Sequence, residues 1–301
     1  MAYFKIKGVF PPMITPFNED DEVDYEKYSN NIKKMNDFDL VGYLVLGSNS
    51  ETVFLTEDEK LKLIELTVKH KKEGKLVMVG TGMESTKSTI ELTNKAADLG
   101  ADCALIITPF YYGGNMNDEA LINYFTEVAD KVKIPVLIYN VTKFTHVNIS
   151  PKAVEVLAKH PNIIGLKDSS GNIPQLVEFK RVVDMNKFNL MVGTASAWYP
   201  ALTLGVQASV MALANCCPGE CIEVQKEYDS GNTEKAREIY ERVFPVNAAV
   251  TGGYGIAGLK YACTLLGFEG GMVRKPLLQP KDDEKVKLKE LLIKSQVLSI
   301  Q

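Results

Sequence analysis

One pattern recurs along this chain of 301 residues: a short apolar run, a polar loop, and then a segment with helical periodicity. This alternation is typical of βα units in a parallel sheet. Neither a G-x-G-x-x-G motif nor a P-loop follows an early run, so a closed (β/α)8 barrel is favoured over an open doubly wound sheet. The eight predicted strands lie at 9–14, 43–46, 76–79, 103–107, 136–139, 163–167, 190–192 and 208–213.

Several helix starts can be identified between these runs. Thr56 and Glu59 have the spacing of a capping box, Asn117 precedes two acidic residues, and Ser150 precedes a proline. Beyond about residue 218 three more helices are predicted, at 220–228, at 233–262 with a glycine-rich interruption over 252–255, and at 282–295. We therefore expect a barrel core over 1–217 and C-terminal helices over 218–301 packed on the same domain.

Charge and hydropathy exclude several classes of partner. The 34 basic and 38 acidic residues give a net charge of -4, and no block of like charge is suited to nucleic acid or to an anionic membrane surface. No apolar run approaches the roughly 20 residues that span a bilayer, and the first residues lack a signal core. We expect a small-molecule partner and a cytoplasmic location.

The five cysteines are odd in number, which argues against a disulfide framework in a chain without a secretion signal. Cys216, Cys217 and Cys221 cluster in the sequence, so a zinc site is one alternative. No histidine lies nearby and the spacing is not that of a four-ligand site. Packed, reduced thiols are the favoured interpretation.

In a parallel barrel the active site is assembled at the carboxyl ends of the strands. Lys167 ends the run over 163–167, and strand alternation puts it on the face opposite Ile164 and Leu166, inside the barrel. Burial there would lower the pKa of its ammonium and supply the neutral amine that Schiff-base chemistry needs. The alternative is a strand-end lysine paired with Asp168.

Two other strand ends carry groups suited to this chemistry. Tyr139 ends the preceding run, where its phenol would stand beside Lys167 and could relay a proton; it could equally be a core tyrosine. The segment 47–51 offers backbone N–H groups and short side-chain donors of the kind that bind a carboxylate. The alternative for this segment is an ordinary polar βα turn.

Together these segments resemble the pyruvate-dependent class I aldolase family of dihydrodipicolinate synthase and N-acetylneuraminate lyase. The sequence GLKDSS over 165–170 is similar to the motif around that family's Schiff-base lysine, and YNV over 139–141 to its Y-N-[VI]-P. The sequences GSNSE over 47–51 and TPFYY over 108–112 are similar to its carboxylate loop and its T-P-[YF]-Y. The resemblance runs from Gly8 to about Leu278.

The resemblance implies a role for each matching residue. Lys167 would form the imine, Tyr139 would shuttle protons, Ser48 and Asn49 would hold the pyruvate carboxylate, and Tyr111 would be lent to a neighbouring subunit's site. It also implies a homo-oligomer, a dimer of dimers, with a 2-oxo acid as substrate and neither a metal nor an organic cofactor. Further substrate contacts are expected from Ser169, Thr194, Ser196 and Val210.

Departures from the family pattern bear on the substrate. Dihydrodipicolinate synthases carry an arginine five residues after the tyrosine, where this chain has Phe144, and Thr142 replaces the motif's proline. Ser50 replaces the usual glycine of the carboxylate loop, which puts the shape of that loop in question. Segments 47–49, 245–251 and 255–260 together look most like those of 4-hydroxy-2-oxoglutarate aldolases. The alternatives are dihydrodipicolinate synthase, neuraminate lyase, and a 2-keto-3-deoxy sugar-acid aldolase or dehydratase.

Two functions of other classes were considered. A metal-dependent aldolase needs a histidine-rich site, which three scattered histidines supply poorly. A non-catalytic binding protein on the same barrel is conceivable because fold does not fix function. The retained lysine, tyrosine and carboxylate loop argue against it.

Overall fold

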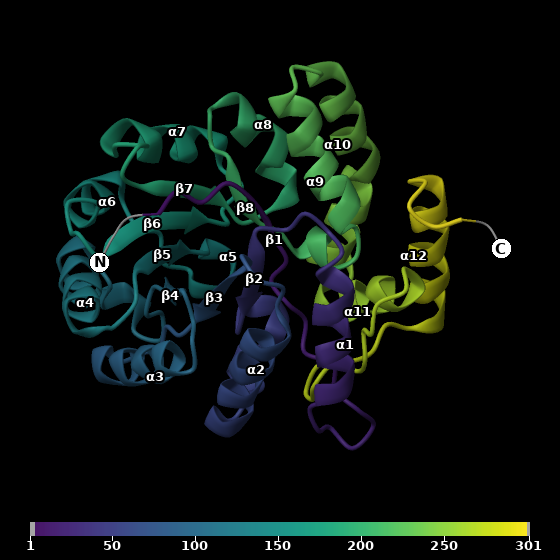
Figure 1. The fold of residues 1–301 in the computed structure, drawn as a ribbon, viewed down its shortest axis with the longest axis horizontal. Coiled ribbons are helices and arrows are strands. Elements are labelled where there is room, and N and C mark those ends of the chain that lie inside the picture. Colours follow the sequence, from purple (N-terminus) through teal and green to yellow (C-terminus); the bar gives the residue numbers. More distant parts are fainter. Residues whose placement is uncertain (1–3, 300–301) are drawn as a thin grey trace. The chain divides into compact units, whose positions relative to one another are not determined.

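The computed structural model describes residues 4–299, and eight strands alternate with helices along them (Figure 1). They form one sheet in the order β1-β8-β7-β6-β5-β4-β3-β2, which is the order of a (β/α)8 barrel and confirms the predicted fold. The strands are β1 (Gly8–Phe10), β2 (Gly42–Val45), β3 (Leu76–Gly80), β4 (Cys103–Ile107), β5 (Val136–Asn140), β6 (Ile163–Asp168), β7 (Asn189–Val192) and β8 (Ala208–Val210).

Helices lie at the three predicted C-terminal positions, with an interruption of the middle one, and connect the strands elsewhere. The α-helices are α1 (Tyr25–Met35), α2 (Glu57–His70), α3 (Thr86–Asp98), α4 (Asp118–Lys131), α5 (Thr142–Thr145), α6 (Pro151–Leu157), α7 (Ile173–Val182), α8 (Trp198–Thr203), α9 (Pro218–Asp229), α10 (Thr233–Ala248), α11 (Gly255–Leu265) and α12 (Asp282–Lys294). Short 3-10 turns η1 (Ser48–Ser50), η2 (Thr52–Phe54), η3 (Gly113–Asn115), η4 (Ala195–Ala197) and η5 (Ala212–Asn215) lie in the loops, and the π-helical turn η6 (Ala249–Gly253) separates α10 from α11.

Side-chain caps fix where several helices begin. The capping box of α2 is present, with Thr56 N–H donating to Glu59 and Glu59 N–H donating to the Thr56 hydroxyl. Asn117 and Ser150 accept from backbone N–H groups in the first turns of α4 and α6. These three predicted helix starts are therefore confirmed.

Two predicted strands are shorter in the structure. The run over 9–14 forms a continuous strand, β1, only to Phe10, and Pro12 extends the pairing as an isolated parallel bridge to Leu44. Pro11 and Pro12 interrupt the ladder because they have no N–H to donate to a neighbouring strand. The run over 208–213 ends as β8 at Val210, and the 3-10 turn η5 follows. The predicted helix over 233–262 is interrupted from Ala249, three residues earlier than expected.

The chain groups into two compact units, each considered by itself. The first comprises Leu76–Val210 and the N-terminal residues up to Lys7, and it contains the parallel strands β3 to β8. Its strands are almost wholly buried on both faces, as expected for a parallel sheet that is covered on one side by helices. In Figure 1 the helices α3, α4, α6 and α7 lie along the outside of this part of the sheet.

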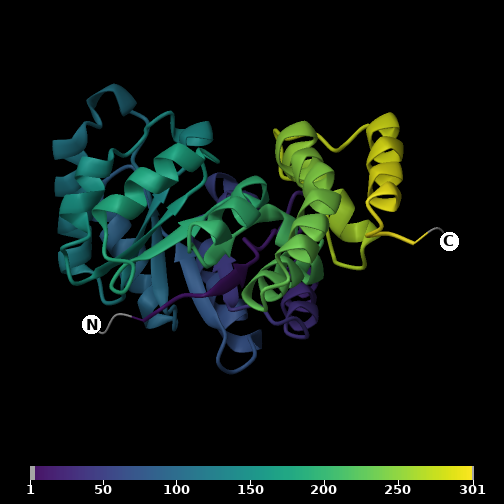
Figure 2. The ribbon, with the colours of Figure 1, turned by 90° about the horizontal axis from the view of Figure 1, so that it is seen from above.

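The second unit comprises Gly8–Lys75 and Met211–Gln301. Here β1 and β2 lie side by side, with Val41 N–H donating to Val9 O, Leu44 N–H to Pro11 O and Met13 N–H to Leu44 O. The helices α9 to α12 belong to this unit and appear in green and yellow in Figure 2. The division into a core over 1–217 and packed helices over 218–301 stays a prediction.

Candidate active site

Lys167 and Tyr139 lie side by side on neighbouring strands. They are partners in the parallel register of β6 and β5, and the Lys167 Nζ lies 4.1 Å from the centroid of the Tyr139 ring. Both side chains are buried, with Lys167 only 3% exposed. The predicted proximity of phenol and amine is therefore present in the first unit.

The hydrogen bonds of the neighbouring residues show which face of the sheet this pair occupies. Asn140 and Asp168, the next residues along β5 and β6, bind each other, and Asn140 also binds Asn148, which in turn is bound to Gln175 of α7. Because successive side chains of a strand alternate, Lys167 and Tyr139 point away from that helix-covered face. In a (β/α)8 fold the opposite face is the barrel interior.

Burial controls the protonation of Lys167. Loss of hydration lowers the pKa of its ammonium, and the neighbouring Tyr139 oxygen opposes part of that effect. A lysine with a lowered pKa has a larger fraction of neutral amine at physiological pH, which is the nucleophilic form. The environment of Lys167 is therefore suited to imine formation.

Three lysines are buried among the described residues, and their surroundings differ. Lys75 Nζ donates to the carbonyl oxygens of Phe38 and Leu40. Lys260 Nζ lies 2.5 Å from Glu51 Oε1 and donates to Met272 O. None of the ion pairs within residues 4–299 joins Lys167 to a carboxylate. Lys75 and Lys260 thus have acceptor oxygens at their ammonium groups, a carboxylate oxygen among them for Lys260, whereas Lys167 has no carboxylate partner among the described residues.

Asp168 is occupied elsewhere, which removes the structural alternative considered for Lys167. Its Oδ1 accepts from Asn140 Nδ2 at 2.8 Å and its Oδ2 accepts from Ser170 Oγ at 2.5 Å. Burial raises the pKa of the Asp168 carboxyl, and the hydrogen bonds from Ser170 and Asn140 oppose that shift. The Asp168 carboxylate therefore links the ends of β6 and β5 through Asn140, and it does not pair with Lys167.

Gly193 closely faces Lys167 and Ser169. A Cβ placed on Gly193 would lie 1.7 Å from Ser169 Oγ and 2.8 Å from Lys167 Cε, distances at which atoms overlap. Ser169 Oγ is itself buried and takes part in none of the hydrogen bonds found among the described residues. A buried hydroxyl without a partner next to the lysine is suited to a bound polar ligand.

The other predicted substrate contacts of the first unit lie at the ends of β7 and β8. Thr194 caps the turn η4, accepting a hydrogen bond from Ser196 N–H at 3.3 Å. Val210 is fully buried at the end of β8, and alternation from the register pairs places it on the same face as Ala208, Met191 and Lys167. The positions are compatible with the predicted roles, which stay predictions.

Tyr111 lies apart from the lysine and tyrosine pair. Its side chain is 76% exposed and packs edge-on against Tyr112, with ring centroids 5.0 Å apart. Glu84 fixes this loop by accepting from the backbone N–H groups of Phe110 and Tyr111. Tyr111 is thus displayed on the surface, and its role in a neighbouring subunit stays a prediction.

Ser48 and Asn49 belong to the second unit. They form the turn η1 with Ser50, and both are half-buried. Ser50, which replaces the family's glycine, is buried, and its hydroxyl donates to Met13 O at 2.6 Å. The substitution is therefore accommodated, because the added hydroxyl anchors the loop to the segment that follows β1.

The clustered cysteines do not form a metal site. Cys216, Cys217 and Cys221 are buried free thiols, and burial together with neighbouring thiols raises their pKa well above the usual value. Within residues 4–299 no group of three or more histidine, cysteine or acidic residues is arranged to hold a metal ion. In the same part of the chain, none of the helices combines the length and apolar character needed to cross a membrane.

Sequence reasoning missed several residues around these sites. Asn140 lies in the YNV motif, but its contacts are not evident from the sequence, and neither are those of Gly193 and Glu84, because all of them join different βα units. Glu51 and Lys260 lie in the motif segments 47–51 and 255–260, but the sequence does not show that they pair. A lysine in an apolar helical segment is a signal that could have prompted the search for a partner.

Comparison with known proteins identifies the family. The profile of the dihydrodipicolinate synthetase family matches residues 5–295. A 4-hydroxy-tetrahydrodipicolinate synthase from Methanothrix thermoacetophila is 32% identical over 288 residues, covering 96% of both chains.

Two solved structures agree with this result. A dihydrodipicolinate synthase from Aquifex aeolicus superposes with a TM-score of 0.91 at 31% identity, covering 98% of this chain and all of the other. A prophage protein of the dihydrodipicolinic acid synthase family from E. coli K12, solved with pyruvate, has a TM-score of 0.91 at 26% identity, covering 97% of this chain and 99% of the other. This chain therefore belongs to the dihydrodipicolinate synthetase family, and it is an enzyme of that family's type, a pyruvate-dependent class I aldolase.

Proposed function

We propose that Lys167 is the imine-forming residue of this aldolase. Its neutral amine would attack C2 of a 2-oxo acid, and loss of water from the carbinolamine would give a protonated imine. Removal of the proton from the C4 hydroxyl would then form the C4 carbonyl as the C3–C4 bond breaks, and the electron pair of that bond would move into the imine to give an enamine and a free aldehyde. Protonation at C3 and hydrolysis would free pyruvate. The observation that carries the proposal is the buried Lys167, held beside Tyr139 and without a carboxylate partner.

The other groups take roles around that sequence of steps. Tyr139 would carry protons to and from the carbinolamine oxygen, because its ring lies against the amine. Ser48 and Asn49, which match the family's carboxylate loop, would bind the pyruvate carboxylate. Ser169, whose buried hydroxyl adjoins the same glycine as Lys167, would donate to a polar group of the substrate.

We further propose that the preferred reaction is cleavage of 4-hydroxy-2-oxoglutarate or a related 4-hydroxy-2-oxo acid to pyruvate and an aldehyde. Phe144 stands where dihydrodipicolinate synthases place an arginine, and its side chain is half exposed. Aspartate semialdehyde brings a carboxylate that suits a guanidinium fork, and an apolar ring cannot supply one.

The chain's arginines do not provide an evident substitute. Each contacts groups of its own unit: Arg181 pairs with Glu178, Arg237 with Glu234, and Arg242 donates to Ser295 O, while Arg274 pairs with Glu59. Amide and hydroxyl donors would hold the smaller substrate instead, more weakly per contact than a guanidinium.

A second candidate is condensation of pyruvate with aspartate semialdehyde. The observation in its favour is that curated relatives of 31 to 34% identity carry the name 4-hydroxy-tetrahydrodipicolinate synthase. For this reaction Lys143 or His146, on the same segment as Phe144, would have to take over the arginine's task.

The two reactions can be compared on one preparation by measuring kcat/KM for each. We expect the cleavage of 4-hydroxy-2-oxoglutarate to have the higher value, and we expect Phe144→Arg to shift the ratio toward the synthase reaction. A higher kcat/KM for dihydrodipicolinate formation by the unmodified enzyme would reject the substrate proposal, while leaving the role of Lys167 intact.

We also propose that the enzyme works without a metal or organic cofactor, as a homo-oligomer, and in the cytoplasm. The imine itself supplies the electron sink, so chelators should leave the activity unchanged. Support for the oligomer comes from the exposed aromatic side chains of Tyr111 and Tyr112 and from the family resemblance at Tyr111.

A further inference from the structure

The carboxylate loop of the second unit ends in a buried acid, Glu51. Its side chain is 2% exposed, its Oε1 lies 2.5 Å from Lys260 Nζ of α11, and its Oε2 accepts from Arg274 N–H at 2.9 Å. Glu51 has φ of 55°, in the left-handed region that non-glycine residues rarely adopt. Contacts from the far end of the sequence thus surround a residue with an uncommon backbone conformation.

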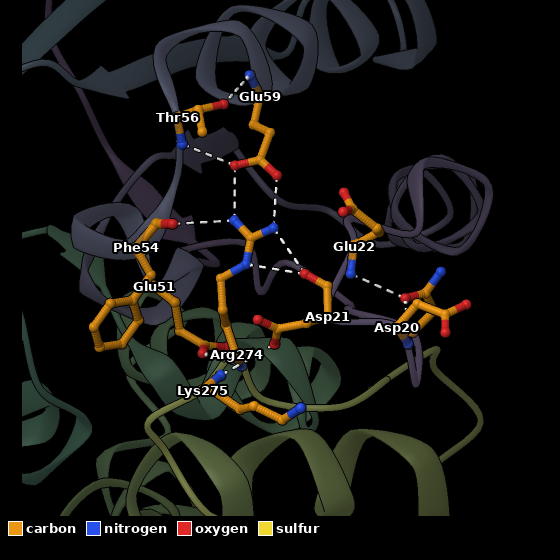
Figure 3. Close-up of polar contacts among 10 residues, drawn as sticks. Asp20, Asp21, Glu22, Glu51, Phe54, Thr56, Glu59, Arg274 and Lys275 are labelled. Carbon is orange, nitrogen blue, oxygen red and sulfur yellow. Dashed lines mark hydrogen bonds and ion pairs between the residues drawn. The ribbon is translucent and has the colours of Figure 1, made fainter.

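Arg274 continues the same network around the loop (Figure 3). Its guanidinium makes two parallel hydrogen bonds of 2.7 Å to the carboxylate of Glu59, and it donates to Phe54 O at 3.0 Å. It also donates to Asp21 O through Nη2 at 2.8 Å. Figure 3 shows the guanidinium between these acceptors, with Glu59 in turn accepting from Thr56 N–H at the start of α2.

Two carboxylates of this network pair with its two cations, and the nearby carboxylates of Asp21 and Glu22 also act on Arg274. Glu51 and Glu59 face Lys260 and Arg274, and both cations also lie 4.5 Å from the centroid of the Phe17 ring. Buried charges persist when each has an opposite partner and further hydrogen bonds, and removing one leaves the other uncompensated. Substitution of any member of the network should therefore disturb the position of the Glu51 side chain.

The loop residues predicted to bind substrate are directly connected to Glu51. Glu51 N–H donates to Ser48 O at 3.2 Å, and Ser50 N–H donates to Gly47 O at 3.0 Å. Two residues therefore fix the backbone of Ser48 and Asn49. Glu51 binds the Ser48 carbonyl, and Ser50, which follows Asn49, is anchored through its hydroxyl to Met13 O.

We propose that Glu51, Lys260 and Arg274 are positioning residues that hold Ser48 and Asn49 in the conformation that binds the carboxylate of a 2-oxo acid. This inference rests on the proposed function of Lys167 and of the loop. It assigns to the C-terminal segment around Lys260 and Arg274 a part in substrate affinity, although neither side chain carries out chemistry. Displacement of binding groups by about 1 Å can cost up to about a hundredfold.

The test is the pyruvate concentration that half-saturates imine trapping by borohydride, measured together with kcat for Glu51→Gln and Lys260→Met. We expect the half-saturating concentration and KM to rise by about tenfold or more, with kcat falling much less. The double variant Glu51→Gln/Lys260→Met removes both charges and should lose less affinity than the sum of the single variants. Arg274→Lys, which keeps the charge but loses the fork, should also raise KM.

Lys75→Met is the matched control. Lys75 is a buried lysine of the same unit that donates to Phe38 O and Leu40 O, before β2, whereas the carboxylate loop follows β2. The Lys75→Met substitution should lower the melting temperature but leave the half-saturating pyruvate concentration unchanged. If a single variant does not fold, the half-saturating pyruvate concentrations of the double variant and of Arg274→Lys test the positioning role.

The outcomes separate this inference from the proposed function. If the unmodified enzyme forms no pyruvate adduct, the proposed function fails. If it forms one, and the folded variants bind pyruvate as the unmodified enzyme does, or Lys75→Met weakens binding equally, the positioning role is overturned.

Discussion

Gly193 leaves the space that the Lys167 side chain and the Ser169 hydroxyl occupy. Gly193→Ala would force the added methyl group into both, and it should reduce the rate of imine trapping by about a hundredfold, because misplacement of the amine by about 1 Å is sufficient. Gly114→Ala is the control, since a Cβ there meets nothing within 4 Å. Unchanged trapping by a folded Gly193→Ala protein would show that Lys167 does not need this position.

Tyr139 is the second residue whose side chain we expect to take part in the reaction. Tyr139→Phe keeps the ring beside Lys167 and removes only the hydroxyl, so kcat should fall by about 10² to 10⁴ with the fold intact. Steady-state kinetics and circular dichroism check this expectation. A near-normal kcat would make Tyr139 a packing residue.

The sequence alone predicts Lys167 and Tyr139 as site residues. Each ends an apolar run, and the alternation of side chains along a strand indicates which face of the sheet it occupies. It does not indicate Gly193, since the overlap that requires glycine involves Ser169 on another βα unit. Nor does it show that Asp168 binds Asn140, which leaves the lysine without a carboxylate partner.

Among the structural elements, α11 and the segment after it contribute the least predictable interactions. Arg274 and Glu59 are 215 residues apart, and local periodicity carries no information about such a pair. The capping box of α2, by contrast, is evident from Thr56 and Glu59 alone. The same Glu59 carboxylate then serves both the helix start and the guanidinium.

Lys260 gives the second unit a distinctive pH dependence. Burial lowers its pKa from 10.5 to about 8, opposed by Glu51, while Arg274 and Cys263 are the other titratable groups that act on it. In the unfolded chain a lysine keeps its proton to about pH 10.4. Between about pH 8 and 10.4 the unfolded state therefore binds more protons, and the free energy of unfolding should rise with pH.

The measurement is urea unfolding of the unmodified protein and of Lys260→Met at pH 7.5 and pH 9.5. The difference in unfolding free energy between the two proteins should grow in favour of the unmodified protein at the higher pH, by on the order of 1 to 2 kcal/mol. If the unfolding free energies of both proteins change equally between pH 7.5 and pH 9.5, Lys260 keeps its proton over that range.

For the whole molecule, the eight apolar runs predict the barrel because they alternate with polar loops and segments of helical periodicity, and three of those helices have a readable N-cap at Thr56, Asn117 and Ser150. The strands that ended early did so for local reasons, as at Pro11 and Pro12. The family resemblance indicates the type of reaction, whereas the substrate depends on single residues such as Phe144, which departs from the family pattern.

The assembly proposed above can be measured directly. Static light scattering should give a dimer or a tetramer, and Tyr111→Ala should lower activity if the side chain completes a neighbouring site. A fully active monomer would refute the oligomer and the role of Tyr111 together.

The central claim is that Lys167 forms an imine with pyruvate. Borohydride reduction in the presence of pyruvate, followed by peptide mass spectrometry, tests it against the other two buried lysines, Lys75 and Lys260. We predict one pyruvate-derived adduct on the peptide that contains Lys167, and none in Lys167→Ala. An adduct on Lys75 or Lys260, or no adduct at all, would contradict the account.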